Sequence, residues 1–355
     1  MTNRRGFLTG LLASSTTPAL SWAAAGNPAF LSSAQLPNGD HVLSGISRSG
    51  GVIFDIPLPA RGHAGARHPD RAEAVFFARR PGTFAHVINC ATGATQRELT
   101  TPIGSHFSGH GTFSQDGMLL FTTENDYQAG RGMIGVWDAA GGYARLGAFL
   151  SGGIGPHEML LDHDGQRLIV ANGGIETHPD SGRAKLNLPV MRPNLAYLSP
   201  TGDLLEVAEP PKHLRRNSIR HIAERTDGTV AIGCQWEGQG HPPVVALHRP
   251  GEDLNFEDQL TPLSKAFDGY VGSVAAERSG QRIAASGPRG GRLACYDPQS
   301  RQVEVFSSAD VCGLAGVKDG FFLSTGTGAL LEIQGKSLRP LAQHNRRWDN
   351  HLVAI

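Results

Sequence analysis

The chain has 355 residues, and its 32 basic residues balance its 32 acidic residues, so its formal net charge is zero. This balance argues against a nucleic-acid partner, because phosphate contacts require a basic surface. The 46 glycines show no Gly-X-Y period and therefore suit many tight turns between short strands, and no apolar run beyond the N-terminal segment is long enough to span a bilayer.

Residues 1–25 have the features of a twin-arginine export signal. Arg4 and Arg5 precede Phe7 and Leu8, a mildly apolar stretch follows, and the small residues 23–25 suit a peptidase site. An ordinary secretory signal with two chance arginines is the alternative. We therefore expect a mature domain over residues 26–355, located in the periplasm.

The four cysteines form no C-x-x-C pair, which argues against a zinc ribbon or a thioredoxin-like motif. Each lies in or near a strand-like run and is expected to act as a small buried apolar residue. An oxidising compartment would permit disulfides, so the disulfide status stays open for Cys90, Cys234, Cys295 and Cys312.

Seven similar units follow one another along the chain. Each contains a short apolar strand that ends in a polar turn, with strand-like runs before and after it. These signatures occupy residues 51–60, 85–94, 134–142, 194–203, 244–253, 292–300 and 329–337. Four short strands per unit of about 40 to 60 residues are typical of propeller blades. The sequence therefore predicts an all-β, seven-bladed β-propeller of WD40 or YVTN type, with six or eight blades as alternatives.

The two ends of the chain are expected to share one blade. The last residues, WDNHLVAI, form an inner-strand signature with nothing after it, whereas the first strands of the mature chain have no inner strand before them. Pairing the C-terminal strand with the N-terminal strands would close the ring and remove two exposed sheet edges.

Histidines recur at the predicted start of the innermost strands, in five of the seven units. Because all inner strands start on the same face of a propeller, these side chains should converge at the mouth of the central channel. Imidazole and carboxylate groups together suit iron, copper or zinc. The predicted metal ligands are His110, His157, His221 and His351, with Glu158 and His63 as additional groups.

The loops between the second and third strands open on this same face and are long and polar. Long loops on a rigid scaffold often carry function. Their predicted ligand-binding residues are Glu124, Asn125, His178, Asp180, Arg183, Arg192 and Gln235. Two other interpretations stay open: the histidines brace neighbouring blades by hydrogen bonds, or they hold an anionic small molecule together with Arg67, Arg183 and Arg192.

Several motifs resemble a family of twin-arginine-exported, propeller-like proteins of Gram-negative bacteria that has no assigned function. The resemblance rests on RGHAG, FSGHGTFSQDG, TTENDY, GIGPHE, VANGGIETHPDSGRAKLNL, SIRHIA and WDNHL, and departs from the family where Ser108 stands in place of an expected aromatic residue. It implies a role related to iron, with imelysin-like periplasmic proteins and a di-haem oxidoreductase-like protein as partners.

Three functions therefore remain as expectations. The first is a periplasmic metal-binding or metal-handling protein related to iron. The second is a metal-dependent enzyme, an oxidoreductase or a hydrolase, with Glu158 or a histidine as general base. The third is a scaffold that binds other proteins through the face of the propeller.

Overall fold

Short runs of branched and aromatic residues form the strands, and tight turns separate them. At one such turn the N–H of Gly165 donates to the carbonyl of Asp162 at 2.9 Å, and Gly165 has a φ of +70°, which a residue with a Cβ rarely adopts. The computed structural model describes residues 20–79, 83–182, 184–256 and 258–355. The predicted signal peptide falls largely outside these residues.

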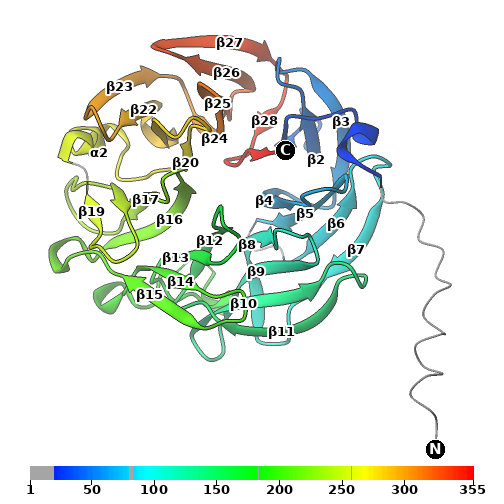
Figure 1. Cartoon of the computed structure of the whole chain (residues 1–355), viewed down its shortest axis with the longest axis horizontal. Helices are drawn as coiled ribbons and strands as arrows, with labels where there is room; N and C mark the ends of the chain where they lie inside the picture. The colour runs from blue at the N-terminus through cyan, green and yellow to red at the C-terminus, as the bar shows by residue number, and fades with distance from the viewer. Residues whose placement is uncertain (1–19, 80–82, 183, 257) are drawn as a thin grey trace, which may run out of the picture.

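The strands form seven antiparallel sheets arranged as blades in a ring, so the predicted seven-bladed propeller is confirmed (Figure 1). The first blade contains β28 (Arg347–Trp348), β29 (Val353–Ala354), β1 (Phe30–Gln35), β2 (His41–Ile46) and β3 (Val52–Leu58). The second contains β4 (Gly62–Arg67), β5 (Glu73–Ala78), β6 (Ala85–Asn89) and β7 (Thr95–Leu99). The third contains β8 (Ser105–Phe113), β9 (Leu119–Asp126), β10 (Arg131–Asp138) and β11 (Ala144–Leu150).

The remaining blades continue around the ring in chain order. The fourth contains β12 (Pro156–Leu161), β13 (Leu168–Asn172), β14 (Asn194–Leu198) and β15 (Leu204–Ala208). The fifth contains β16 (Asn217–Glu224), β17 (Val230–Trp236), β18 (Val245–His248) and β19 (Asn255–Phe256). The sixth contains β20 (Ser273–Ala276), β21 (Ile283–Gly287), β22 (Arg292–Asp297) and β23 (Gln302–Ser307), and the seventh contains β24 (Val311–Val317), β25 (Gly320–Thr325), β26 (Ala329–Gln334) and β27 (Ser337–Gln343).

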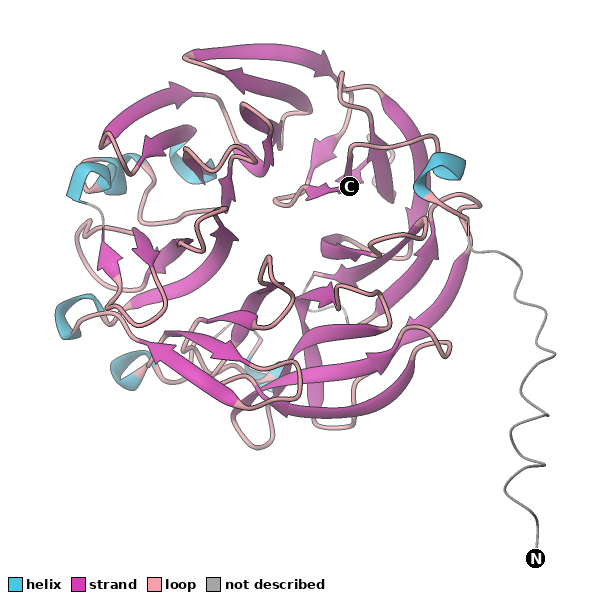
Figure 2. Cartoon of the chain, viewed as in Figure 1, coloured by secondary structure: helices cyan, strands magenta, loops and turns pink. Residues whose placement is uncertain are grey.

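Among the described residues the helical segments are few and short; one precedes β1 and the others lie in connections between strands (Figure 2). They are η1 (Trp22–Ala25), η2 (Pro179–Ser181), η3 (Leu188–Val190), η4 (Lys212–Leu214), η5 (Asp258–Leu260), α2 (Leu263–Ala266) and η6 (Pro288–Gly290). Within the described part of the chain, none of these helices has the length and apolar character that crossing a membrane requires.

The core lies between the faces of adjacent blades rather than at the ring centre. One apolar cluster joins the fourth, fifth and sixth blades and includes Tyr197, Ile232, Phe267 and Ile283. Full burial of each such side chain stabilises the fold by about 1.5–3 kcal/mol. The four cysteines are buried and unpaired, and burial raises the pKa of each thiol.

Both ends of the described chain meet in the first blade. β28 and β29 pair antiparallel with β1, and the short stretch between them carries His351. The Ser32 hydroxyl donates to the His351 carbonyl at 2.9 Å, and the Asp349 N–H donates to the Ser33 carbonyl at the same distance. These bonds fix His351 beside the inner strands of the neighbouring blades.

Candidate metal centre

The inner strands share an irregularity where they approach the channel mouth. Their pairing with the second strand shifts register between Gly62 and Gly65 in β4, between Phe107 and Gly111 in β8, between Pro156 and Met159 in β12, and between Ile219 and His221 in β16. Each shift gives the inner strand at least one extra residue, as in a β-bulge, and such an insertion re-aims the side chains it contains. The bulges carry or adjoin four of the five predicted histidines, whereas His351 reaches the channel from the break between β28 and β29.

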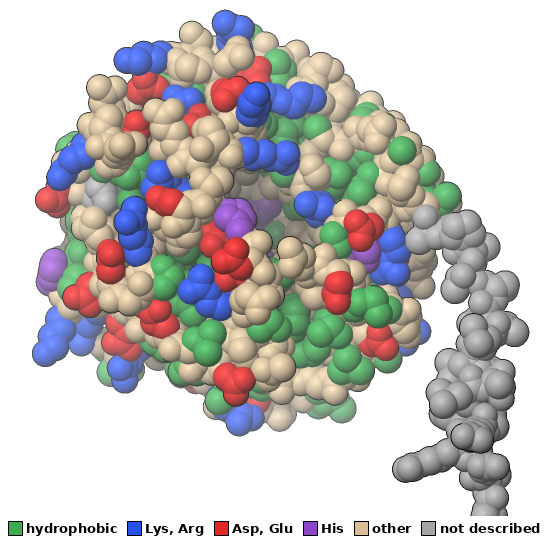
Figure 3. All heavy atoms as spheres, viewed as in Figure 1, with side chains coloured by type: hydrophobic (Ala, Val, Ile, Leu, Met, Phe, Trp, Pro, Cys, Tyr) green, Lys and Arg blue, Asp and Glu red, His purple; other side chains and the backbone are tan. Residues whose placement is uncertain are grey.

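The five imidazoles from five different blades converge at the ring centre. The ring of His63 lies 5.0 Å from that of His110, 5.7 Å from that of His157 and 4.7 Å from that of His351, measured between centroids. His221 completes the group at 4.9 Å from His157 and 5.1 Å from His351. Figure 3 shows histidine side chains in the central hollow of this face. We call these five residues the histidine cluster.

Two overlapping sets within this group have ligand atoms close enough to share an ion. One ligand atom each from His63, His110 and His351 lie within 4.8 Å of one another, and the same holds for Glu158, His221 and His351. Ligand nitrogens around one ion at a metal–nitrogen distance of about 2.1 Å lie about 3.4 Å apart, so small ring rotations would suffice. His351 belongs to both sets and is therefore the central residue of the site.

Glu158 orients one member of the cluster. Its carboxylate lies 3.0 Å from Nδ1 of His221 and accepts the N–H of Ile222 at 3.2 Å, while its other oxygen is 4.0 Å from Nδ1 of His110. A carboxylate that accepts from one imidazole nitrogen leaves the other nitrogen free as a ligand, as in carboxylate–histidine–metal sites. Burial raises the pKa of Glu158 to about 7.

Each histidine of the cluster has one buried ring nitrogen without a hydrogen-bond partner in the structure. These atoms are Nδ1 of His63, Nε2 of His110, Nδ1 of His157, Nε2 of His221 and Nε2 of His351. Buried polar atoms without partners are rare, because each costs about 1–3 kcal/mol. Five such atoms at one place leave five ring nitrogens that could each donate to, accept from or coordinate a bound group.

Burial also keeps these imidazoles in the form that binds metal. It lowers the pKa of His221 to about 3 and that of His351 to about 4, with the charges of Arg220 and His221 respectively adding to the effect. The pKa values of His63, His110 and His157 fall well below their usual range for the same main cause. The five rings are therefore neutral near pH 7, and neutral imidazole is the common metal ligand.

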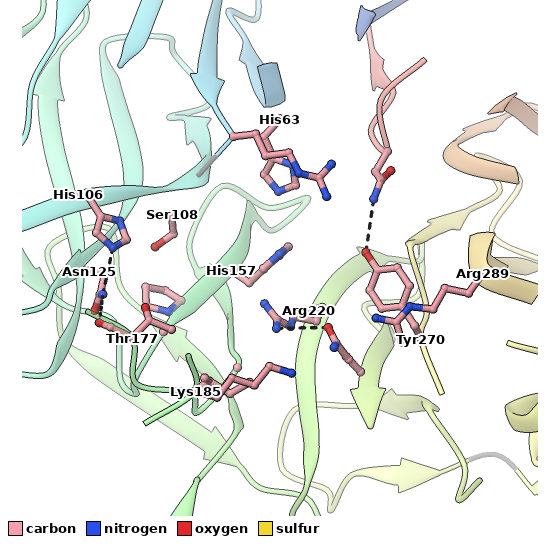
Figure 4. A pocket seen from close by; sticks show the side chains of 17 residues that line it. His63, His106, Ser108, Asn125, His157, Thr177, Lys185, Arg220, Tyr270 and Arg289 are labelled. Carbon is pink, nitrogen blue, oxygen red and sulfur yellow. Dashed lines mark hydrogen bonds between the residues drawn. The ribbon is translucent and has the colours of Figure 1, made fainter. Parts of the chain in front are cut away.

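A cavity of about 410 Å³ opens directly above the cluster, with His63 and His157 forming part of its wall. The predicted residues Asn125 and Gln235 also line it. Asn125 donates to the Thr177 carbonyl at 3.3 Å, and Gln235 accepts from Arg220 at 3.4 Å (Figure 4). The structure therefore brings the histidines and two of the predicted loop residues to one place.

The other predicted loop residues that the structure describes do not line the cavity. Glu124 is 1% exposed inside the third blade, where it binds Arg145 through two contacts of 2.7 and 2.8 Å. His178 accepts the N–H of Asp180 at 3.3 Å and starts η2. Asp180 is largely exposed, with 89% of its side chain accessible. Arg192 is also exposed and pairs with Glu209 at 2.9 Å, and Arg183 lies outside the described residues.

Several cavity residues had no place in the sequence-based prediction. Arg79, Arg220, Tyr270 and Arg289 line the cavity together with Lys185, whereas Arg67, expected beside an anion, does not. Arg220 directly precedes His221 and is the residue that the bulge of β16 leaves unpaired. The motif SIRHI contains this neighbour, but strand alternation alone would point Arg220 away from the side that His221 occupies.

A family model described as a protein of unknown function (DUF1513) matches residues 56–355. The chain belongs to this family. The DUF1513 match contains every residue of the histidine cluster and Glu158, so the whole site lies inside the family region. A search of curated proteins finds no significant match.

Among solved structures, a chain of the hydrazine synthase of Kuenenia stuttgartiensis has a similar fold. It is 12% identical, the alignment covers 86% of this chain and 89% of that one, and the TM-score is 0.57. At this identity the likeness concerns the fold alone, so the function of the DUF1513 protein has to be argued from its own site.

A substitution at Gly109 tests whether the close approach of this residue keeps His63 in place. Gly109 has a φ of +107°, and a Cβ at this position would lie 2.5 Å from Cδ2 of His63. We expect Gly109→Ala to displace His63 and weaken metal binding about tenfold or more, as for other changes that misplace a ligand. Equilibrium dialysis checks this. Gly228→Ala is the control, because Gly228 also has positive φ (+77°) but no neighbour within 4 Å; equal effects of both variants would contradict the proposed contact.

Proposed function

We propose that this propeller binds a first-row transition-metal ion at the histidine cluster. The observation that carries the proposal is that five imidazole rings lie together at the ring centre, and each has one buried nitrogen without a partner among the described residues. Nitrogen-rich sites favour iron, copper, nickel or zinc over calcium or magnesium, which prefer oxygen ligands. In this proposal His63, His110, His221 and His351 supply nitrogen ligands, His157 lies at the cavity side, and Glu158 orients His221 or joins the ligands.

The position of the cluster supports a role beyond structural bracing. A histidine that braces two blades would have both ring nitrogens paired, as His248 does with Tyr197 of the fourth blade at 2.7 Å and with the Glu252 carbonyl of its own blade at 2.9 Å. The histidine cluster shows the opposite pattern, because each ring retains an unpaired nitrogen. A cavity adjoins it, so a bound ion would be reachable from the face of the propeller.

The proposal also includes a cellular location and partner proteins. The twin-arginine motif of the first residues supports export to the periplasm after folding, and the family resemblance supports a role related to iron with imelysin-like and di-haem oxidoreductase-like partners. A metal-dependent reaction in the cavity is the second candidate, favoured by the direct contact between the cavity and His63 and His157.

Metal titration of the purified mature protein tests the proposal. We expect about one equivalent of iron(II), copper(II) or zinc(II) to bind per chain and to raise the melting temperature, because a ligand that binds only the folded state stabilises it. Calcium and magnesium should have no comparable effect. A protein that contains only trace metal after mild purification and binds none of the three ions on titration would refute the proposal.

A further inference from the structure

The charged side chains that line the cavity above the histidine cluster are all basic. Four basic side chains line it, and none of the lining residues in the described chain is an aspartate or a glutamate. The basic residues are Arg79, Lys185, Arg220 and Arg289. A cavity with one sign of charge concentrates ligands of the opposite sign.

Two of these four cations have carboxylate partners just outside the cavity wall. Arg79 lies 3.2 Å from Asp349, which also binds Arg61 at 2.5 Å, and Lys185 pairs with Glu237. These pairs are complete without a ligand, so Arg79 and Lys185 contribute to the field of the cavity more than to direct binding.

Arg220 and Arg289 differ from the other two basic residues, because neither has a carboxylate within 4.0 Å among the described residues. In the described part of the chain, Arg220 has one side-chain acceptor, Gln235 at 3.4 Å, and its buried Nε has no partner. Glu237 acts on Arg220 only from a distance, since its ion pair is with Lys185. The guanidinium of Arg289 lies 4.7 Å from the ring centre of Tyr270.

The two arginines lie along one side of the cavity, next to Tyr270 (Figure 4). Gln235, the partner of Arg220, forms a backbone bridge with Tyr270, and Tyr270 itself lies 3.4 Å from the Asn350 amide. Guanidinium groups present a planar fork of donors that matches a carboxylate, and an arginine that has no carboxylate partner, such as the half-buried Arg220 or the exposed Arg289, can accept one from a ligand.

We propose that this cavity binds a small dicarboxylate, with one carboxylate on Arg220 and the other directed toward Arg289. Arg220 directly precedes His221 on β16, so the ligand lies beside the metal site and is a substrate or an additional ligand of the ion. The role as a neighbour of the ion rests on the proposed function, whereas binding of the anion does not. Pro156 and Ile175 are apolar residues that also line this cavity.

Calorimetric titration with succinate, run on both metal-free and metal-loaded protein, tests the inference. We expect succinate to bind both forms, the neutral isostere succinamide to bind neither, and Arg220→Gln to weaken succinate binding about 10- to 100-fold. Arg67→Gln is the matched control, because Arg67 does not line this cavity and should leave the affinity unchanged.

The outcomes separate this inference from the metal proposal. If the protein binds metal but no succinate, or if Arg220→Gln binds succinate as tightly as the wild type, the dicarboxylate site is refuted and the metal site stands. If inorganic phosphate binds more tightly than succinate, the ligand class proposed here is wrong. If succinate binds the metal-free protein in an Arg220-dependent way while no ion binds, the anion site holds and the metal proposal fails.

Discussion

Replacing both His110 and His351 with alanine is expected to abolish stoichiometric metal binding. His351 belongs to both sets of residues that can share an ion, and His110 belongs to one of them. The double substitution removes two ligands from the set that contains His63 and one ligand from the set that contains Glu158 and His221. Loss of a group that only orients a ligand costs about 10- to 100-fold in affinity, so loss of two ligands should cost more than about 100-fold.

The measurement is the metal content of wild type and double variant after loading and dialysis, with melting temperatures of the metal-free forms alongside. The metal-free variant should keep its fold, because the substitutions remove two buried nitrogens that have no partner. His213→Ala is the control, since His213 is exposed on η4. Retention of a full equivalent of metal by a folded double variant would show that the ion binds elsewhere.

Replacing Arg145 with methionine is expected to destabilise the fold by about 3–5 kcal/mol without affecting metal binding. Arg145 holds both oxygens of Glu124, whose side chain is 1% exposed, and the variant would leave that buried carboxylate with only the Thr122 hydroxyl at 2.8 Å. The guanidinium also lies 5.0 Å from the ring centre of Trp137, so packing is lost as well.

Urea denaturation of three variants tests whether the unpaired carboxylate of Glu124 causes the destabilisation. Arg145→Met combined with Glu124→Gln should recover part of the loss, because the uncompensated charge is gone. Arg131→Met provides the matched control from the same sheet, since the Arg131–Asp126 pair is exposed and worth about 0–1 kcal/mol. Equal destabilisation by Arg131→Met and Arg145→Met would contradict this explanation.

The sequence predicts the fold and the convergence of the histidines for a common reason. In a propeller every inner strand starts on the same face, so residues that recur at that place must meet around the channel. His63, His110, His157 and His221 lie on inner strands and follow this rule, whereas His351 reaches the channel from the break between β28 and β29. The bulges that aim their side chains into the channel were not predictable, because a bulge depends on the pairing of two strands rather than on one.

Glu124 and Asn125 show where sequence reasoning stops. Both lie in β9 and were expected to line the same site, but successive residues of a strand face opposite sides of the sheet. Asn125 therefore reaches the cavity, while Glu124 points into the blade and pairs with Arg145. The long connection between β13 and β14 follows no such rule, so strand alternation could not predict that Arg192 lies outside the cavity.

The most direct test of the account is anomalous diffraction from crystals of metal-loaded protein, measured above and below the absorption edge of the metal. The account predicts one strong peak at the ring centre, about 2.0–2.3 Å from a ring nitrogen of His351 and from at least two further atoms of the histidine cluster and Glu158. A peak confined to surface histidines, or no peak in crystals soaked with iron, copper or zinc, would contradict it.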